Sequence, residues 1–217
     1  MITVKRFILG SIETNTYVLE SDGLCAVIDP AVESKELLGY LKDKSVKYIL
    51  LTHGHFDHIS GVNSIVRETG AKVCVHSLDS EMLQDGNKSR YNFHFGSIQP
   101  EIKADVTLND EDVITLGETV IRVMHTPGHT NGSVCYILEN ERIIFSGDTL
   151  FRLSAGRTDL AGISPVLAAR NELESLQKLA QLSGDYRVLP GHEEETTLQF
   201  ERENNRYMRG RNASYSY

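Results

Sequence analysis

The sequence has no apolar segment near the roughly 20 residues that a membrane-spanning helix needs. It also has no apolar segment behind a basic N-terminus, which is the pattern of a secretory signal. Cysteine is scarce: Cys25, Cys74 and Cys135 are far apart, and each lies in an apolar, strand-like run. Their odd number and placement favour buried free thiols over disulfides or metal ligands. We therefore expect a cytoplasmic protein without membrane contacts.

A basic surface is missing as well. The 22 lysines and arginines are outnumbered by 30 aspartates and glutamates, which leaves a net charge of −8. Proteins that bind nucleic acids normally present a basic face, so the composition argues against such a partner. A hydrophobic content of 40% is sufficient for a large core, and the length of 217 residues favours one α/β domain over two small ones.

Apolar and β-branched runs predict strands, and leucines at helical spacing predict the helices between them. We expect strands at residues 2–9, 15–20, 24–28, 48–51, 119–124, 133–138, 142–145 and 187–189. We expect helices at residues 33–42, 60–68, 165–182 and 194–208. The order of these elements indicates two mixed βα halves.

The helix that begins at Ser164-Pro165 has a cap residue and a proline at its first position. Its predicted buried face consists of Leu167, Leu173, Leu176, Leu179 and Ala180. Residues 84–104 are polar and contain glycines and a proline, and a loop this long in a compact domain is usually a lid or a binding loop.

The most informative stretch of the sequence follows the apolar run at residues 48–51. Four side chains that can bind metal, His53, His55, Asp57 and His58, fall within six residues. Imidazole and carboxylate groups are the usual ligands of Zn²⁺ and similar ions. His53 and His55 can lean the same way on an extended loop, whereas the adjacent Asp57 and His58 must diverge. One loop can therefore offer two pairs of ligands to two neighbouring metals.

Three further residues of the same chemical kind lie in glycine-containing turns. They are His129 after Pro127-Gly128, Asp148 after Gly147, and His192 after Pro190-Gly191. Each turn follows an apolar run, which places the residue at the end of a strand, where loops carry chemistry. A chance cluster of polar loop residues does not explain three such turns.

Together these residues resemble the metallo-β-lactamase-fold hydrolases, and the resemblance covers residues 1–210. The stretches 147–151, 156–159 and 189–197 are similar to the single-domain branch of glyoxalase II, the hydroxyacylglutathione hydrolases. The resemblance implies an αββα sandwich, in which two mixed β-sheets lie face to face with helices outside. Residues 211–217 would then form a flexible C-terminal tail.

The resemblance also implies a dinuclear metal site. In this reading the first ion is held by His53, His55 and His129, and the second by Asp57, His58 and His192. Asp148 bridges the two ions, and Asp57 and Asp148 count as catalytic. The affinity order of divalent ions favours zinc, with iron or manganese as alternatives.

The implied activity is hydrolysis of a small thioester, S-acyl-glutathione or a similar thiol ester, through a hydroxide that bridges the metals. The two-domain glyoxalase II enzymes have a lysine at the position of Arg157. Arg157 is therefore a candidate contact for a substrate carboxylate, with a structural ion pair to Asp159 as the alternative. Those enzymes also carry a C-terminal helical domain that helps to bind glutathione. This sequence ends soon after His192, so broader recognition of the thiol carrier is expected.

Two other functions compete with this reading. An iron-dependent persulfide dioxygenase shares the first motif and the stretch Gly156-Arg157-Thr158-Asp159, and it uses one iron held by two histidines and one aspartate. A non-catalytic metal-binding module would typically have lost ligands, and none is missing. A β-lactamase is a weaker candidate because the sequence shows no secretory signal. Composition and spacing do not predict the oligomeric state.

Overall fold

The computed structural model describes residues 2–209, so the expected tail lies outside the described residues. The first of two six-stranded sheets has the strand order β1-β2-β3-β4-β5-β6. Strands β1 to β3 pair antiparallel, and β3 to β6 pair parallel. The bounds are β1 (Thr3–Leu9), β2 (Thr14–Ser21), β3 (Leu24–Ile28), β4 (Ser45–Leu50), β5 (Lys72–His76) and β6 (Val106–Leu108).

The second sheet has the order β14-β13-β10-β9-β8-β7 and is antiparallel except between β10 and β13. Its strands are β7 (Val113–Leu116), β8 (Thr119–His125), β9 (Val134–Leu138), β10 (Ile143–Gly147), β13 (Arg187–Pro190) and β14 (Thr196–Thr197). A separate two-stranded ribbon joins β11 (Leu150–Phe151) to β12 (Ser154–Ala155).

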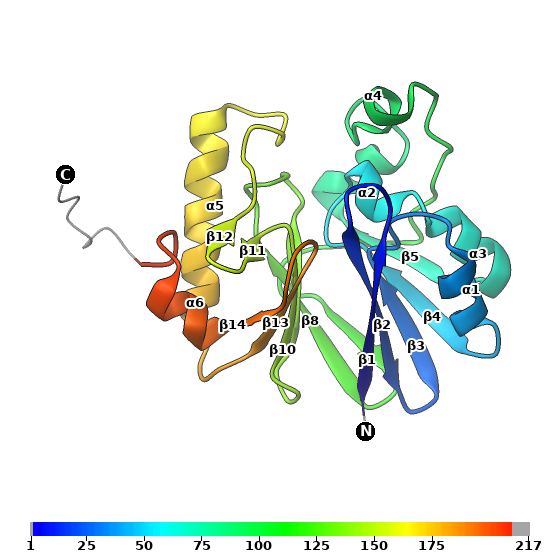
Figure 1. Ribbon diagram of the computed structural model, residues 1–217, viewed down its shortest axis with the longest axis horizontal. Coiled ribbons are helices and arrows are strands. Elements are labelled where there is room, and N and C mark those ends of the chain that lie inside the picture. Colours follow the sequence, from blue (N-terminus) through cyan, green and yellow to red (C-terminus); the bar gives the residue numbers. More distant parts are fainter. Residues whose placement is uncertain (1, 210–217) are drawn as a thin grey trace.

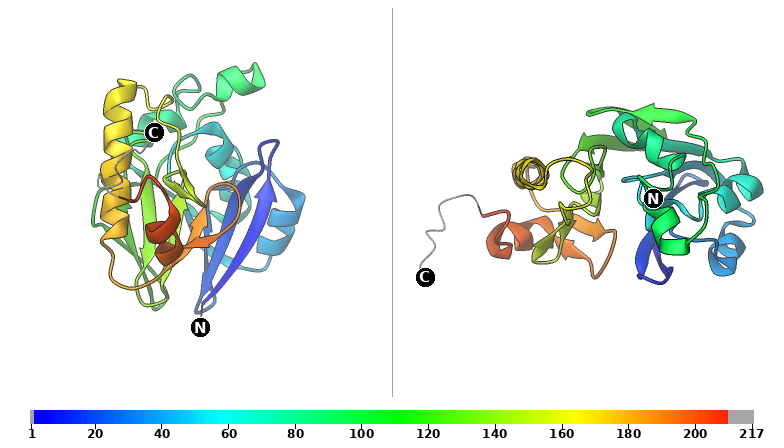
Figure 2. Two further views of the ribbon diagram at one scale, coloured as in Figure 1. Left: turned by 60° about the vertical axis from the view of Figure 1, so that its left-hand side comes forward. Right: turned by 90° about the horizontal axis from the view of Figure 1, so that it is seen from above.

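Some helices lie on the outer faces of the two sheets, and others lie at the upper edge of the molecule (Figure 1). They are α1 (Lys35–Leu41), α2 (Phe56–Ile59), α3 (Val62–Thr69), the 3₁₀-helix η1 (Ser77–Leu83), α4 (Tyr91–Phe95), α5 (Pro165–Ala180) and α6 (Leu198–Asn204). Helices α1 and α3 flank the first sheet, while α5 and α6 flank the second. Seen from above, α5 lies end-on outside the strands of its sheet (Figure 2).

Three apolar clusters fill the spaces between these layers. Tyr17 and Leu19 of the first sheet meet Tyr136 and Phe145 of the second in the central cluster. A second cluster lies between the first sheet and α1 and α3, and a third lies between the second sheet and α5 and α6. The predicted αββα sandwich is therefore confirmed, and the three cysteines are buried free thiols as expected. No helix within residues 2–209 is long and apolar enough to span a membrane.

The predicted buried face of α5 was partly wrong. Leu167 and Leu173 are 48% and 45% exposed, respectively. The residues of this helix that are buried are Ala168, Glu172, Ser175, Leu176 and Leu179. The buried face of the helix therefore contains both polar and apolar side chains. Glu172 belongs to this face because it packs directly against Gly128. The last helix is also shorter than predicted, since residues 196–197 form β14.

Parallel pairing brings several strand ends to one edge of the molecule. Ile28 at the end of β3 lies opposite Leu50 of β4, and Gly147 of β10 lies opposite Pro190 of β13. The backbone N–H of Asn15, on β2, donates to the carbonyl of Gly191 at 2.7 Å and so joins the first sheet to the loop after β13. The loops that follow these strands therefore meet between the two sheets.

Candidate metal centre

All seven side chains that the sequence predicted as ligands come together at this edge. They form three overlapping groups, in each of which the candidate ligand atoms lie within 4.8 Å of one another. The groups are His53, His55 and His129; His53, His58 and Asp148; and Asp57, His58 and His192. His53, His58 and Asp148 connect the two outer groups into one continuous cluster.

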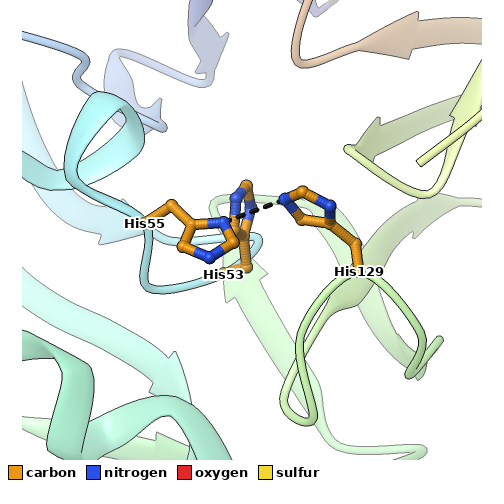
Figure 3. A group of neighbouring side chains, drawn as sticks. All are labelled: His53, His55 and His129. Atoms are coloured by element: carbon orange, nitrogen blue, oxygen red, sulfur yellow. Dashed lines mark hydrogen bonds between the residues drawn. The ribbon is translucent and has the colours of Figure 1, made fainter. Parts of the chain in front are cut away.

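The first group consists of three imidazoles whose rings point toward one another (Figure 3). The ring centroids of His53, His55 and His129 are 4.7–4.9 Å apart. Nδ1 of His55 lies 2.9 Å from Nε2 of His129. Two nitrogens at this distance need a shared proton or a shared cation between them, and the tetrahedral ligands of one zinc ion sit at a similar spacing.

The second group is built around the carboxylate of Asp57. Oδ2 of Asp57 lies 3.2 Å from Nε2 of both His58 and His192. Asp148 lies between the two groups, with its carboxylate 3.4 Å from Nε2 of His58, 3.5 Å from that of His129 and 3.7 Å from that of His192. Asp148 is therefore placed to serve both groups at once.

Hydrogen bonds at Nδ1 fix the orientation of two buried rings. Nδ1 of His58 donates to Oδ2 of Asp29 at 2.9 Å. The hydroxyl of Thr52 donates to the same oxygen and accepts from Nδ1 of His53 at 3.1 Å. Because Nδ1 of each ring makes this hydrogen bond, Nε2 is the nitrogen that faces the cluster and can bind a metal.

Main-chain carbonyls orient two further histidines of the cluster in the same way. Nδ1 of His129 donates to the carbonyl of Arg157 at 2.8 Å, and Nδ1 of His192 donates to the carbonyl of Ile12 at 3.2 Å. A carbonyl can only accept, so these rings also turn Nε2 toward the cluster.

Several buried atoms of the cluster have no hydrogen-bond partner within the described residues. They include Nε2 of His53, Nε2 of His58 and Oδ1 of Asp148. Buried polar atoms without partners are rare in folded proteins, and each needs an explanation such as a bound ion. A set of imidazoles and carboxylates suits divalent cations of borderline softness. The cluster is therefore suited to a dinuclear metal site.

Two imidazoles of the first group, His53 and His55, are held neutral. Burial lowers the pKa of His53 and of His55 well below the usual range, and neighbouring histidines add to the effect. A neutral imidazole is the form that binds a metal.

The second group carries opposite charges instead. Burial opposes a charge on His58, but Asp57, Asp148 and Asp29 outweigh it and raise the pKa of His58 well above its ordinary value. Burial likewise raises the pKa of the Asp57 carboxyl, but His58 and the hydrogen bond from His192 outweigh it and hold that pKa far below the usual range. The carboxylates around His58 favour a positive charge at this place. A divalent cation carries a larger positive charge than a proton and would therefore be attracted more strongly.

Glycine at position 191 allows the loops to approach closely. A Cβ atom there would lie 2.3 Å from Oδ1 of Asp148 and 2.8 Å from Cε1 of His58. Both distances are far below van der Waals contact, so any other residue at position 191 would displace two members of the cluster.

The Arg157 side chain forms the ion pair with Asp159 that the sequence offered as the alternative to a substrate contact. Its guanidinium forms two hydrogen bonds with the Asp159 carboxylate, at 3.0 and 2.7 Å, and is 68% exposed. The sequence reasoning also missed Asp29, which accepts from Thr52 and His58. Asp29 directly follows the apolar run 24–28, the same signal that identified Asp148 and His192.

The fold and the cluster together define an α/β protein of the metallo-hydrolase type, with a cluster between the sheets that is suited to a dinuclear metal site. A model of the Metallo-beta-lactamase superfamily matches residues 10–192, and the chain belongs to that family. The chain is 32% identical to the probable metallo-hydrolase YqgX of Bacillus subtilis, over 95% of this chain and 97% of that protein. It is also 32% identical to a hydroxyacylglutathione hydrolase of Francisella tularensis subsp. novicida, over 88% and 67%.

Solved structures show the same similarity. The B3 metallo-beta-lactamase BLEG-1 has 35% identity and a TM-score of 0.87, with 96% of this chain and 100% of that chain covered. TTHA1623 in a di-iron-bound form has 33% identity and a TM-score of 0.80, with 94% and 99% covered. ETHE1 from Myxococcus xanthus has 25% identity and a TM-score of 0.72, with 94% and 83% covered.

Proposed function

We propose that this protein is a thioester hydrolase of the hydroxyacylglutathione hydrolase type. The observation that carries the proposal is the convergence of seven imidazole and carboxylate ligands, several with buried atoms that lack partners among the described residues. The similarity to the hydroxyacylglutathione hydrolase supports the choice of a thioester. A thioester also suits the site because its leaving thiolate is a soft ligand.

In this proposal His53, His55 and His129 hold one ion, Asp57, His58 and His192 hold another, and Asp148 joins them. Two bound divalent cations lower the pKa of water to about 7 and polarise a carbonyl oxygen. We propose zinc as the first choice because of its affinity, with iron or manganese as alternatives.

The exposure of the cluster side chains indicates the side from which a substrate would reach the metal site. The side chains of His58 and His129 are 0% and 5% exposed, whereas those of Asp148, Asp57 and His192 are 11%, 12% and 21% exposed. The substrate carbonyl is therefore received on the side of Asp57, Asp148 and His192. The buried histidines keep water away from the back of the site and hold the ligands rigid.

Two exposed apolar residues lie near this side of the cluster. Ile12, whose carbonyl holds His192, is 45% exposed, and Phe95, which packs against Phe56 next to His55, is 47% exposed. Apolar surface at this place suits a small acyl group with some apolar surface of its own. We retain Arg157 as a contact for a carboxylate of the thiol carrier, which requires that the substrate take the place of Asp159.

A panel of thioesters tests the proposal on protein of measured metal content. S-D-lactoylglutathione and other small S-acyl thiol esters should be cleaved, and a chelator should abolish the activity while added zinc restores it. Absence of thioester cleavage by protein with a full metal complement would contradict the proposal.

Hydrolysis of a β-lactam is a second candidate, supported by the similarity to BLEG-1 over nearly the whole of both chains. A β-lactam amide is also a carbonyl compound, so the same cluster could act on it. Including a penicillin and a cephalosporin in the panel separates the two activities by their relative kcat/KM.

Because the chain is also similar to ETHE1, the persulfide dioxygenase alternative should be tested as well. If the protein holds a single iron and consumes O₂ with a glutathione persulfide but cleaves no ester or lactam, the dioxygenase reading replaces the hydrolase reading.

A further inference from the structure

Asp79, a residue of η1, connects the two loops that carry the first histidine group. Its carboxylate is buried, with the residue 1% exposed. Oδ2 accepts from the backbone N–H of Gly54 at 2.9 Å and from the hydroxyl of Thr130 at 2.7 Å, while Oδ1 accepts from the backbone N–H of Gly132 at 2.7 Å. Gly54 lies between His53 and His55, and Thr130 directly follows His129.

Close packing supports this connection. A Cβ atom at Gly132 would lie 2.6 Å from Oδ1 and 2.7 Å from the backbone nitrogen of Asp79, so only glycine permits the contact. Met82, also in η1, packs directly against Gly54, where an added Cβ would meet the Met82 Cβ at 2.6 Å. The η1 helix therefore contacts both the His53–His55 loop and the loop after His129. Hydrogen bonds to the Asp79 carboxylate connect these two loops.

We propose that Asp79 is a positioning residue for the first histidine group, and that its carboxylate sets the spacing between the His53–His55 loop and His129. The proposal rests on the proposed metal centre but not on any substrate. A carboxylate suits this place because three donors converge on it and it has only acceptors. An amide keeps one oxygen and turns its NH₂ group toward a donor, so at least one bond is lost.

The second group is held by other contacts. Asp29 orients His58, the carbonyl of Ile12 orients His192, and Thr14 donates to Asp57 at 3.3 Å. Within the described part of the chain, the hydrogen bonds of the Asp79 carboxylate go to Gly54, Thr130 and Gly132. Loss of Asp79 should therefore weaken metal binding at one group far more than at the other, whereas a general loss of structure would weaken both.

Zinc titration of metal-free protein with ¹⁵N-labelled histidine tests this selectivity, because the ring signals report each imidazole separately. In Asp79→Asn, the zinc concentration that half-shifts the signals of His53, His55 and His129 should rise by about 10–100-fold. The signals of His58 and His192 should titrate at the wild-type concentration. Equal weakening of all five signals, or no change in any, would overturn the proposal.

Two variants serve as controls. Asp105→Asn removes a carboxylate that accepts from the backbone N–H of Val73 at 3.0 Å, at the other end of β5, and should leave all five signals at their wild-type positions. Thr130→Val removes one of the three bonds to Asp79, and should shift the same three histidines in the same direction by a smaller factor. If Asp79→Asn does not fold, Thr130→Val decides the proposal, and unchanged titration of the three histidines would overturn it.

The titration uses no thioester, so its outcome is independent of the proposed substrate. If the wild type binds only one ion, the two-ion proposal is wrong, yet the comparison of Asp79→Asn with Asp105→Asn at His53, His55 and His129 still decides the role of Asp79.

Discussion

Replacing His76 should change how the stability of the protein depends on pH. His76 is 3% exposed, and its ring stacks on that of His125 with centroids 4.2 Å apart and planes 9° apart. Its Nδ1 accepts from the backbone N–H of Leu78 at 3.3 Å and so caps η1. Burial, together with His125, lowers the pKa of His76 from 6.5 to about 4.

The sign and size of the effect follow from proton linkage. Because the folded-state pKa is the lower one, the unfolded chain takes up a proton first as the pH falls below 6.5, and stability is lost down to a pH of about 4. A tenfold difference in proton affinity between the folded and unfolded chains corresponds to about 1.4 kcal/mol of unfolding free energy. Between about pH 7.5 and about pH 5, His76 should therefore account for roughly 2 kcal/mol of lost stability.

His76→Asn keeps an acceptor at the cap but does not titrate. Urea unfolding of metal-free wild type and variant, each at both pH values, gives the difference in pH dependence. Histidines in the metal cluster contribute equally to both proteins and cancel. The variant should lose about 2 kcal/mol less stability on acidification. His94→Asn, at an exposed histidine, should behave as the wild type. If His76→Asn loses as much stability as the wild type, the linkage argument is wrong.

Three further predictions concern the cluster. Asp148→Ala and His129→Ala should each reduce turnover without unfolding the protein. The reduction should exceed the roughly 10–100-fold that results from loss of a residue that hydrogen-bonds to a metal ligand. Activity near that of the wild type at saturating metal would reject the ligand assignment. Gly191→Ala should lower the metal content, because its Cβ displaces Asp148 and His58; elemental analysis showing two ions per chain would refute this. Arg157→Ala should raise KM more than it lowers kcat, since contact with a remote anion is mostly uniform binding; an unchanged KM with reduced thermal stability would assign Arg157 a purely structural role beside Asp159.

The cluster could be predicted because its residues follow apolar runs. A strand ends where polar, glycine-containing sequence begins, and this signal identified Asp148 after β10 and His192 after β13. The parallel pairing of these two strands then explains why residues 44 positions apart in the sequence meet. The same signal is present at Asp29, which directly follows the apolar run at residues 24–28.

Other features depend on tertiary contacts that no local pattern records. Asp79 follows β5 but lies within η1, and its role depends on two loops that are distant in sequence. The face of α5 could not be predicted from leucine spacing, because the buried carboxyl of Glu172 takes an inward position. Desolvation raises its pKa from 4.5 to about 9, so that carboxyl is neutral near pH 7, which reduces the cost of burying it.

The contact between His129 and Arg157 has a consequence for how the family can diversify. The ring of His129 is oriented by the main-chain carbonyl of residue 157, which is present whatever side chain that position carries. A mutation at position 157 can therefore change the side chain beside the cluster while the imidazole of His129 keeps its alignment. The chemistry of the side chain at position 157 and the orientation of the His129 ring can thus vary independently of each other.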